Sequence, residues 1–301
     1  MSRLLIILIL VCALPMRVDA QRKRAFMVGI SDYRSYGYRV WNNIHGAEDV
    51  ALLRPELEKR GFRVTALTNA QATHRAIVSA LASFIAGCRR GDVVYLHFSC
   101  HGQPVEDGLK SGYPSHDEAD QWDESIVPVD AGNAYDAKGY RGEKHITDDE
   151  LRQHILRLRR KIGKQGTLIV VVDACHAGNM EREDFETVRG TNEGLARNPQ
   201  RKYNPKKGVV KRSKPQRSPL LSPVVFAEAC ESFQRNQEIT YNMKEYGALS
   251  FNVWQMLRQS AAFPKDVTDF KSKLSTNILQ NTRLRNRLWP ATQTVVFEYC
   301  E

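Results

Sequence analysis

Several signatures of common protein classes are missing from this chain. Beyond its N-terminus no apolar stretch approaches twenty residues, which excludes a polytopic membrane protein. No glycine-rich phosphate loop follows the first predicted strand and no paired CxxC motif occurs, so the usual support for a nucleotide-binding protein or a zinc ribbon is absent. Internal repeats and heptad runs are also lacking, which argues against repeat architectures.

Acidic residues are scarce in one segment, and that segment carries most of the net charge. The chain has 44 Lys and Arg against 34 Asp and Glu, a net charge of +10. Residues 189–217 hold ten basic residues and one acid, Glu193, and so contribute +9. With three prolines and few apolar residues, this segment is typical of an exposed loop. The remainder is nearly charge-balanced, so no specific nucleic-acid partner is expected.

The N-terminus has the pattern of a secretory leader. Arg3 precedes an apolar run over residues 4–14, and Val18-Asp19-Ala20 has the small-residue pattern that a signal peptidase needs. We predict a signal peptide over residues 1–20, secreted or periplasmic localisation, and no stable membrane association after cleavage. An uncleaved anchor is the alternative. Five of the six cysteines remain in the mature chain, so at least one thiol is unpaired.

Apolar runs alternate with helical patterns along the mature chain. Strands are predicted over 25–30, 64–67, 93–98, 168–172, 224–229 and 292–297, and helices over 47–60, 73–88, 147–158 and 250–258. Near-continuous apolar strands separated by helices are typical of a parallel sheet with both faces covered. The sequence therefore predicts an α/β fold in three layers, a mostly parallel six-stranded sheet flanked by helices.

Two predicted strands end in chemically reactive residues. The strand over 93–98 runs into Ser99, Cys100, His101 and Gly102, and the strand over 168–172 runs into Asp173, Ala174 and Cys175. Ligand sites of open α/β sheets lie at the carboxyl ends of the strands, where these residues can face each other.

These residues fit nucleophilic catalysis on an amide. Such chemistry needs a thiolate, an imidazole that carries protons, and backbone N–H groups that hold the developing oxyanion. We assign Cys175 as the nucleophile, His101 as the acid/base, and the amides of Gly102 and Cys175 as the oxyanion donors. His97, within the strand, and His176, after the nucleophile, are weaker candidates for the base.

Simpler interpretations compete with this assignment. An isolated cysteine or histidine is more often a buried thiol or a satisfied ring than a catalytic group. A metal cluster of Cys100, His101, Cys175 and His176 is disfavoured, because adjacent Cys-His pairs cannot readily present both side chains to one ion. Cys230, at the end of a later strand, is expected to be packed rather than reactive.

Residues 95–102 (YLHFSCHG) and 171–178 (VVDACHAG) resemble the two catalytic boxes of caspase-like peptidases, especially metacaspases and their bacterial relatives. The similarity extends to residues 120–130 (DQWDESIVPVD) and 146–150 (ITDDE), in the expected order. One departure is Cys100, where the family usually has glycine before the histidine.

The resemblance implies a caspase-like fold and a division of the chain. Residues 21–188 correspond to the large catalytic portion, residues 189–219 to a basic processing linker, and residues 220–301 to a small portion that completes the same domain. The implied activity is that of an exported cysteine endopeptidase, a hydrolase of peptide bonds. A gingipain-like or legumain-like peptidase is an alternative within the same clan. A catalytically silent caspase-fold scaffold that uses the basic loop is the alternative of another class.

The resemblance also implies a substrate class. Asp49, Ser99 and Asp173 correspond to residues of the first specificity pocket, so protein or peptide substrates with Arg or Lys at the cleaved bond are the expected partners. Each acid has a simpler explanation. Asp49 favours the N-terminal turn of its helix, and Asp173 orients the Cys175 loop by hydrogen bonds.

Calcium activation and self-processing are further implications of the resemblance. The candidate calcium ligands are Asp130, Asp148 and Asp149, with Asp184 a looser fourth, although acids are expected at a helix start without any metal. The dyad chemistry itself requires no cofactor. Lys207, Lys211 and Arg217 are the candidate processing sites in the linker, and a solvated polyanion-binding loop is the alternative for this segment.

Overall fold

The computed structural model describes residues 21–35, 41–113, 120–175, 188–191, 193–204, 215–283 and 288–300. The predicted leader, His176, Asp184, Lys207 and Lys211 lie outside these ranges. No helix within the ranges is both long and apolar enough to cross a membrane.

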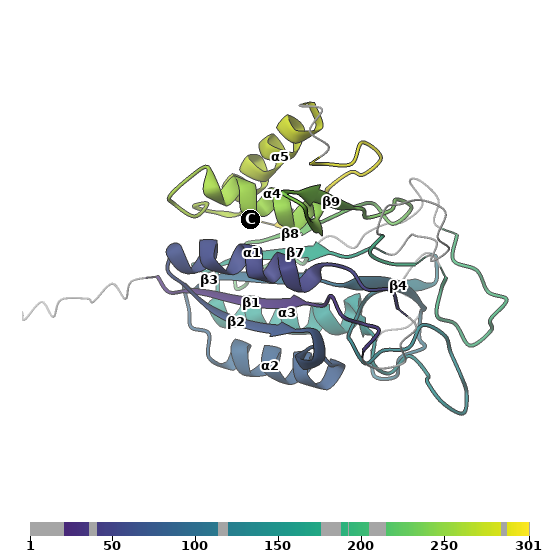
Figure 1. The fold of residues 1–301 in the computed structure, drawn as a ribbon. Helices are drawn as coiled ribbons and strands as arrows, with labels where there is room; N and C mark the ends of the chain where they lie inside the picture. Colours follow the sequence, from purple (N-terminus) through teal and green to yellow (C-terminus); the bar gives the residue numbers. More distant parts are fainter. Residues whose placement is uncertain are drawn as a thin grey trace, which may run out of the picture.

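A six-stranded sheet forms the middle layer of the molecule (Figure 1). Its strands are β1 (Lys23–Gly29), β2 (Phe62–Thr68), β3 (Val93–Ser99), β7 (Thr167–Asp173), β8 (Val224–Glu228) and β11 (Val296–Cys300), in the order β11-β8-β7-β3-β1-β2. All neighbouring pairs are parallel except β11, which runs antiparallel to β8. The predicted α/β fold class with a mostly parallel six-stranded sheet is confirmed.

Helices cover both faces of the sheet (Figure 1). The helices α1 (Gly46–Lys59), α4 (Ala248–Arg258) and α5 (Val267–Arg283) lie on one face, and α2 (His74–Ala86) and α3 (Asp148–Ile162) lie on the other. Each face has its own apolar core, with Phe251 and Phe270 buried on the first and Phe84 and Ile155 buried on the second. The two cores explain why β3, in the middle of the sheet, is buried along its whole length.

One helix of the structure was not predicted from the sequence, and one strand was predicted too early in the chain. Helix α5 buries Val267, Phe270, Leu274 and Ile278, a spacing that is itself typical of a helix. The last strand was predicted over 292–297, but β11 begins at Val296. The preceding residues form a turn instead, in which the backbone N–H of Gln293 donates to the carbonyl of Pro290.

A second, smaller sheet and a hairpin were not predicted. The antiparallel strands β4 (His101–Glu106), β5 (Trp122–Val127) and β6 (Ile146–Thr147) form the sheet, and β9 (Glu238–Tyr241) pairs with β10 (Lys244–Gly247). These strands are short and carry many polar residues, so they lack the continuous apolar signal of the central sheet. β4 begins at the candidate base His101 itself, and β9 begins at Glu238.

The backbone brings three chain segments together at one edge of the sheet. β3 and β7 are neighbours whose register pairs Ser99 with Asp173, so both strands end at the same level. Helix α1 begins against this edge. A Cβ on Gly46 would lie 2.2 Å from the carbonyl oxygen of Ser99, so only glycine permits this approach. Asp49, in the first turn of α1, is thereby placed beside Ser99.

Candidate active site

His101 is held in one orientation by its surroundings. Its Nε2 lies 2.7 Å from the carbonyl oxygen of Asn42. Because a carbonyl only accepts, we assign the ring proton to Nε2. The ring stacks on Trp41 at 5.1 Å between centroids and contacts Tyr33 at 4.8 Å. Within the described chain, Nδ1 is buried without a hydrogen-bond partner, and burial lowers the pKa of the ring to about 4. A neutral imidazole with a free lone pair on Nδ1 is suited to accept a proton.

Cys175 lies two residues after the carboxyl end of β7 and is fully buried. Its Sγ donates to the carbonyl oxygen of Gln234 at 3.0 Å, and the Sγ of Cys230 lies 3.5 Å from the same oxygen. Cys230 is thus packed against the candidate nucleophile. Burial raises the pKa of the third nearby thiol, Cys100, to about 12, which makes a thiolate there unfavourable.

The two predicted oxyanion donors point at one carbonyl group, that of Arg189. The backbone N–H of Cys175 donates to the Arg189 oxygen at 2.9 Å, and that of Gly102 donates to it at 3.4 Å. The Arg189 N–H in turn donates to the carbonyl of Asn236 at 3.0 Å. The backbone at Arg189 and Gly190 therefore pairs with the backbone beside the candidate dyad, as a bound extended peptide would. The carbonyl oxygen of Arg189 lies where an oxyanion would form.

The side chain of Arg189 fills the pocket of the three predicted specificity residues. Its Nη1 lies 2.7 Å from Asp49 Oδ2 and 2.6 Å from Ser99 Oγ, and Asp173 Oδ1 is 3.7 Å away. The Arg189 side chain has no exposed surface. Burial raises the pKa of Asp49 to about 7, while Arg189 acts in the opposite direction. Burial alone would lower the pKa of Arg189, but the facing carboxylates Asp49 and Glu238 raise it.

A fourth acid, Glu238, faces the other edge of the same guanidinium. Its Oε1 accepts from Arg189 Nε at 2.9 Å and from Nη2 at 2.7 Å. Gly247 closes the pocket, since a Cβ there would lie 2.2 Å from Asp173 Oδ2 and 2.5 Å from Arg189 Nη1. Its N–H donates to Asp49 Oδ1 at 3.0 Å. The pocket is therefore built from both halves of the chain.

Asp173 is engaged mainly by neutral donors. Its Oδ1 accepts from the side-chain amide of Asn236 at 2.7 Å. Its Oδ2 accepts from the backbone N–H of Ser250 at 2.7 Å and from the Ser250 hydroxyl at 2.6 Å. These contacts fit the simpler role considered for Asp173, which is to orient the loop that carries Cys175, alongside its charge in the pocket. His97, also buried, contacts Tyr95 and Ser250 rather than the dyad.

The proposed calcium ligands do not converge in the described residues. Asp130 accepts from the backbone N–H of His74 at 2.9 Å and pairs with Lys144 at 3.4 Å. Asp148 pairs with Arg152 at 2.7 Å and lines a cavity of about 380 Å³. Burial raises the pKa of Asp148 to about 6. Asp149 is buried in the first turn of α3.

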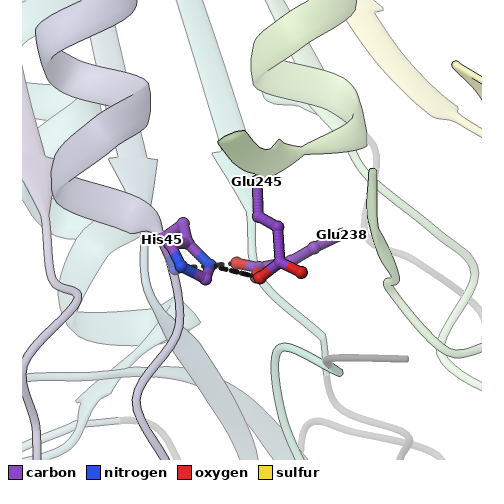
Figure 2. A group of neighbouring side chains, drawn as sticks. All are labelled: His45, Glu238 and Glu245. Carbon is purple, nitrogen blue, oxygen red and sulfur yellow. Dashed lines mark hydrogen bonds and ion pairs between the residues drawn. The ribbon is translucent and has the colours of Figure 1, made fainter. Parts of the chain in front are cut away.

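In the described ranges, one group of three side chains brings atoms that could ligate a metal ion within 4.8 Å of one another. Figure 2 shows this group, which consists of His45, Glu238 and Glu245. The His45 Nδ1 lies 2.6 Å from Glu238 Oε2 and 3.2 Å from Glu245 Oε2. A hydrogen bond that His45 donates to the Glu238 carboxylate raises the pKa of His45, so pairing of an imidazolium with two carboxylates accounts for the arrangement without an ion.

Arg189 was identified from the sequence only as the start of the basic segment, and Glu238 only as part of the small portion. The available signal for Arg189 was its position as a basic residue a short distance after the nucleophile, followed by the small residue Gly190. Of the candidate processing sites, Arg217 is exposed in the structure. It is Arg189 that occupies the acidic pocket.

Comparisons with known proteins give the family. The model of the metacaspase, peptidase C14 domain matches residues 23–182, which is 160 of the 301 residues. Metacaspase-1B of Aspergillus fumigatus is 31% identical over 170 residues, 52% of this chain and 36% of that protein. Metacaspase-2 of Arabidopsis thaliana is 28% identical over 166 residues, 53% of this chain and 35% of that protein. The chain thus spans about a third of the length of these curated relatives.

A solved structure supports the fold. The protein GSU0716 from Geobacter sulfurreducens superimposes with a TM-score of 0.60, covering 93% of each chain at 17% sequence identity. That likeness concerns the fold alone. The sequence resemblance is confirmed by the family match, which includes His101, just after β3, and Cys175, just after β7. The chain belongs to the metacaspase family of the C14 peptidases.

Proposed function

We propose that this chain is a cysteine endopeptidase that cleaves after Arg or Lys, and that its own Arg189–Gly190 bond is a substrate. The observation that carries the proposal is the position of Arg189. Its carbonyl oxygen accepts from the two candidate oxyanion donors, while its side chain is buried among carboxylates. A substrate arginine at the cleaved bond would need both sets of contacts at once.

The residues around that bond support a defined sequence of steps. His101 Nδ1 accepts the proton of the Cys175 thiol, and Sγ forms a bond to the carbonyl carbon of Arg189. The N–H groups of Gly102 and Cys175 stabilise the oxyanion. The C–N bond to Gly190 then breaks, and the imidazolium returns its proton to the leaving amine. Water, deprotonated by the same imidazole, hydrolyses the thioester and restores the thiol.

The main chain on either side of the bond is held as a substrate would be. Val188 forms an antiparallel bridge with Gln237, and the N–H of Thr191 donates to the carbonyl of Gly102 at 3.3 Å. Further on, Leu195 is buried and its N–H donates to Pro104 at 2.8 Å. Backbone pairing of this kind binds an extended peptide largely irrespective of its sequence, whereas the acidic pocket supplies the selectivity.

The proposed cut after Arg189 is additional to the processing sites expected from the sequence. Lys207, Lys211 and Arg217 remain sequence-based predictions of further cuts in the linker. Export of the chain rests on the leader pattern of residues 1–20, and calcium activation rests on the family resemblance. Both are part of the proposal.

The proposal is tested by peptide hydrolysis. Matched fluorogenic peptides with Arg, Lys or Asp at the cleaved bond are incubated with the mature chain and with Cys175→Ala, with calcium and with chelator. We expect cleavage after Arg and Lys that is lost in the variant. Faster cleavage after Asp would contradict the pocket assignment. No cleavage under any condition, including after deliberate nicking between Arg189 and Gly190, would favour the silent scaffold instead.

A further inference from the structure

We infer that Glu238 makes the pocket select arginine over lysine. This inference rests on the proposed function, because it concerns the residue at the cleaved bond. Substrates with arginine at the cleaved bond then form the preferred class, and substrates with lysine form the disfavoured class. The preference is assigned to a carboxylate outside the predicted set of Asp49, Ser99 and Asp173.

The two edges of the buried guanidinium have different partners. On one edge, Nη1 contacts Asp49 Oδ2 at 2.7 Å and Ser99 Oγ at 2.6 Å. On the other edge, Nε at 2.9 Å and Nη2 at 2.7 Å share Glu238 Oε1. Asp173 is farther away, at 3.7 Å, and is occupied by Asn236 and Ser250. Glu238 is therefore the only one of the three acids that contacts Nε.

A lysine side chain cannot reproduce this arrangement. The guanidinium is a planar fork whose N–H groups span two opposed carboxylates, whereas the ammonium is a single charged point at the end of a shorter chain. A lysine in the backbone position of Arg189 would have a single nitrogen, which could not contact both Asp49 and Glu238, because these lie on opposite sides of the pocket. The carboxylate that the ammonium does not reach would lose its charge-assisted hydrogen bond from the substrate, which is unfavourable in a buried pocket.

Glu238 is also held by contacts that do not involve Arg189. Its Oε1 accepts from the backbone N–H of His45 at 2.8 Å, and its Oε2 lies 2.6 Å from His45 Nδ1. Figure 2 shows the Glu238 carboxylate directed at the imidazole, with Glu245 approaching the same ring. The Glu238 side chain is 2% exposed. Burial opposes ionisation, but Arg189 and His45 lower the pKa of Glu238 below its usual range.

The position of Glu238 in the chain couples it to the substrate backbone. It lies two residues after Asn236, whose carbonyl accepts from the Arg189 N–H at 3.0 Å. Its strand partner Gly247 closes the pocket and donates to Asp49. A substrate that pairs with Asn236 is thus brought into register with Glu238.

The test compares specificity constants for matched peptides that differ only in Arg or Lys at the cleaved bond. We expect the wild-type chain to prefer Arg by tenfold or more. Glu238→Ala should reduce kcat/KM for the Arg peptide by about 30-fold and for the Lys peptide by no more than about threefold, since it removes two charge-assisted hydrogen bonds that only Arg makes. Glu238→Gln, which keeps an acceptor, should restore part of the Arg preference. The matched control is Glu245→Gln, which removes a nearby charge that contacts His45 but not the guanidinium.

A binding measurement separates failure of the inference from failure of the proposed function. The variant Cys175→Ala/Arg189→Ala is catalytically inert and has an emptied pocket, and its Tm is measured with N-acetyl-arginine amide or N-acetyl-lysine amide. We expect a larger stabilisation by the Arg ligand, lost on adding Glu238→Ala. If this selectivity holds while the wild-type chain cleaves no peptide, the inference stands and the proposed function fails. Equal losses for Arg and Lys in Glu238→Ala, or an unchanged ratio, would overturn the inference while leaving the peptidase assignment intact.

Discussion

Replacing Gly190 with alanine should block cleavage of the chain by itself. A Cβ on Gly190 would lie 1.9 Å from the carbonyl oxygen of Cys175 and 2.9 Å from that of Gly102. Both are backbone atoms of the site, so neither can move away as a flexible side chain would. The Arg189 carbonyl would have to leave its donors, and loss of even one oxyanion donor lowers the rate by about 100-fold to 1,000-fold.

The assay follows conversion of the purified mature chain to two fragments by denaturing gel and intact mass. We expect Gly190→Ala to be processed at least about 100-fold more slowly than wild type. The control is Thr191→Ala, which changes the next residue and removes a methyl group and a hydroxyl that accepts from the backbone N–H of Glu193. It should be processed within about threefold of wild type, since this hydrogen bond is a single neutral one. Equal rates for Gly190→Ala and wild type would refute the placement of this bond in the site.

Three further predictions follow from the site and the core. Because burial raises the pKa of Asp49 to about 7 even with Arg189 beside it, and the ionised form binds a basic residue, kcat/KM for an Arg peptide should fall by at least about tenfold from pH 8 to pH 6. Asp49→Asn should remove that limb of the pH profile, and the same limb in the variant would contradict the assignment. If calcium acts through the cavity beside α3, Asp148→Asn should abolish a calcium-dependent rise in activity, and an unchanged rate with chelator would remove this role. Phe270→Ala, in the α5 core, should lower the free energy of unfolding by about 3–5 kcal/mol in denaturant titration, and a loss below about 1 kcal/mol would contradict its role in packing.

The placement of the candidate catalytic residues could be predicted because they lie at, or just after, the ends of two strands. Strands β3 and β7 are continuous apolar runs, and parallel strands that pair in register end at one level. Ser99, His101, Asp173 and Cys175 therefore had to lie near each other once the alternation of strands and helices was recognised. The amides of Gly102 and Cys175 followed for the same reason, since each belongs to the first residues beyond a strand.

The residues that complete the pocket could not be found in this way. Arg189 lies 140 residues from its partner Asp49, in a segment with no periodic pattern. Its charge does not separate Arg189 from the other basic residues of the linker. Glu238 begins a four-residue strand whose hairpin has too few residues to give a clear alternation. Glu238 is positioned by its contact with His45, and Arg189 by its contact with Asn236. Local sequence preferences specify neither of these tertiary contacts.

Mapping the termini of the processed chain shows whether Arg189 occupies the site as a substrate residue. The purified mature chain and its Cys175→Ala variant are incubated under identical conditions and analysed by intact mass and N-terminal sequencing. This position of Arg189 predicts a fragment that ends at Arg189 and a second that begins at Gly190, both absent from the variant. An active enzyme that stays intact, or is cut at Lys207, Lys211 or Arg217 with the Arg189–Gly190 bond preserved, would contradict it.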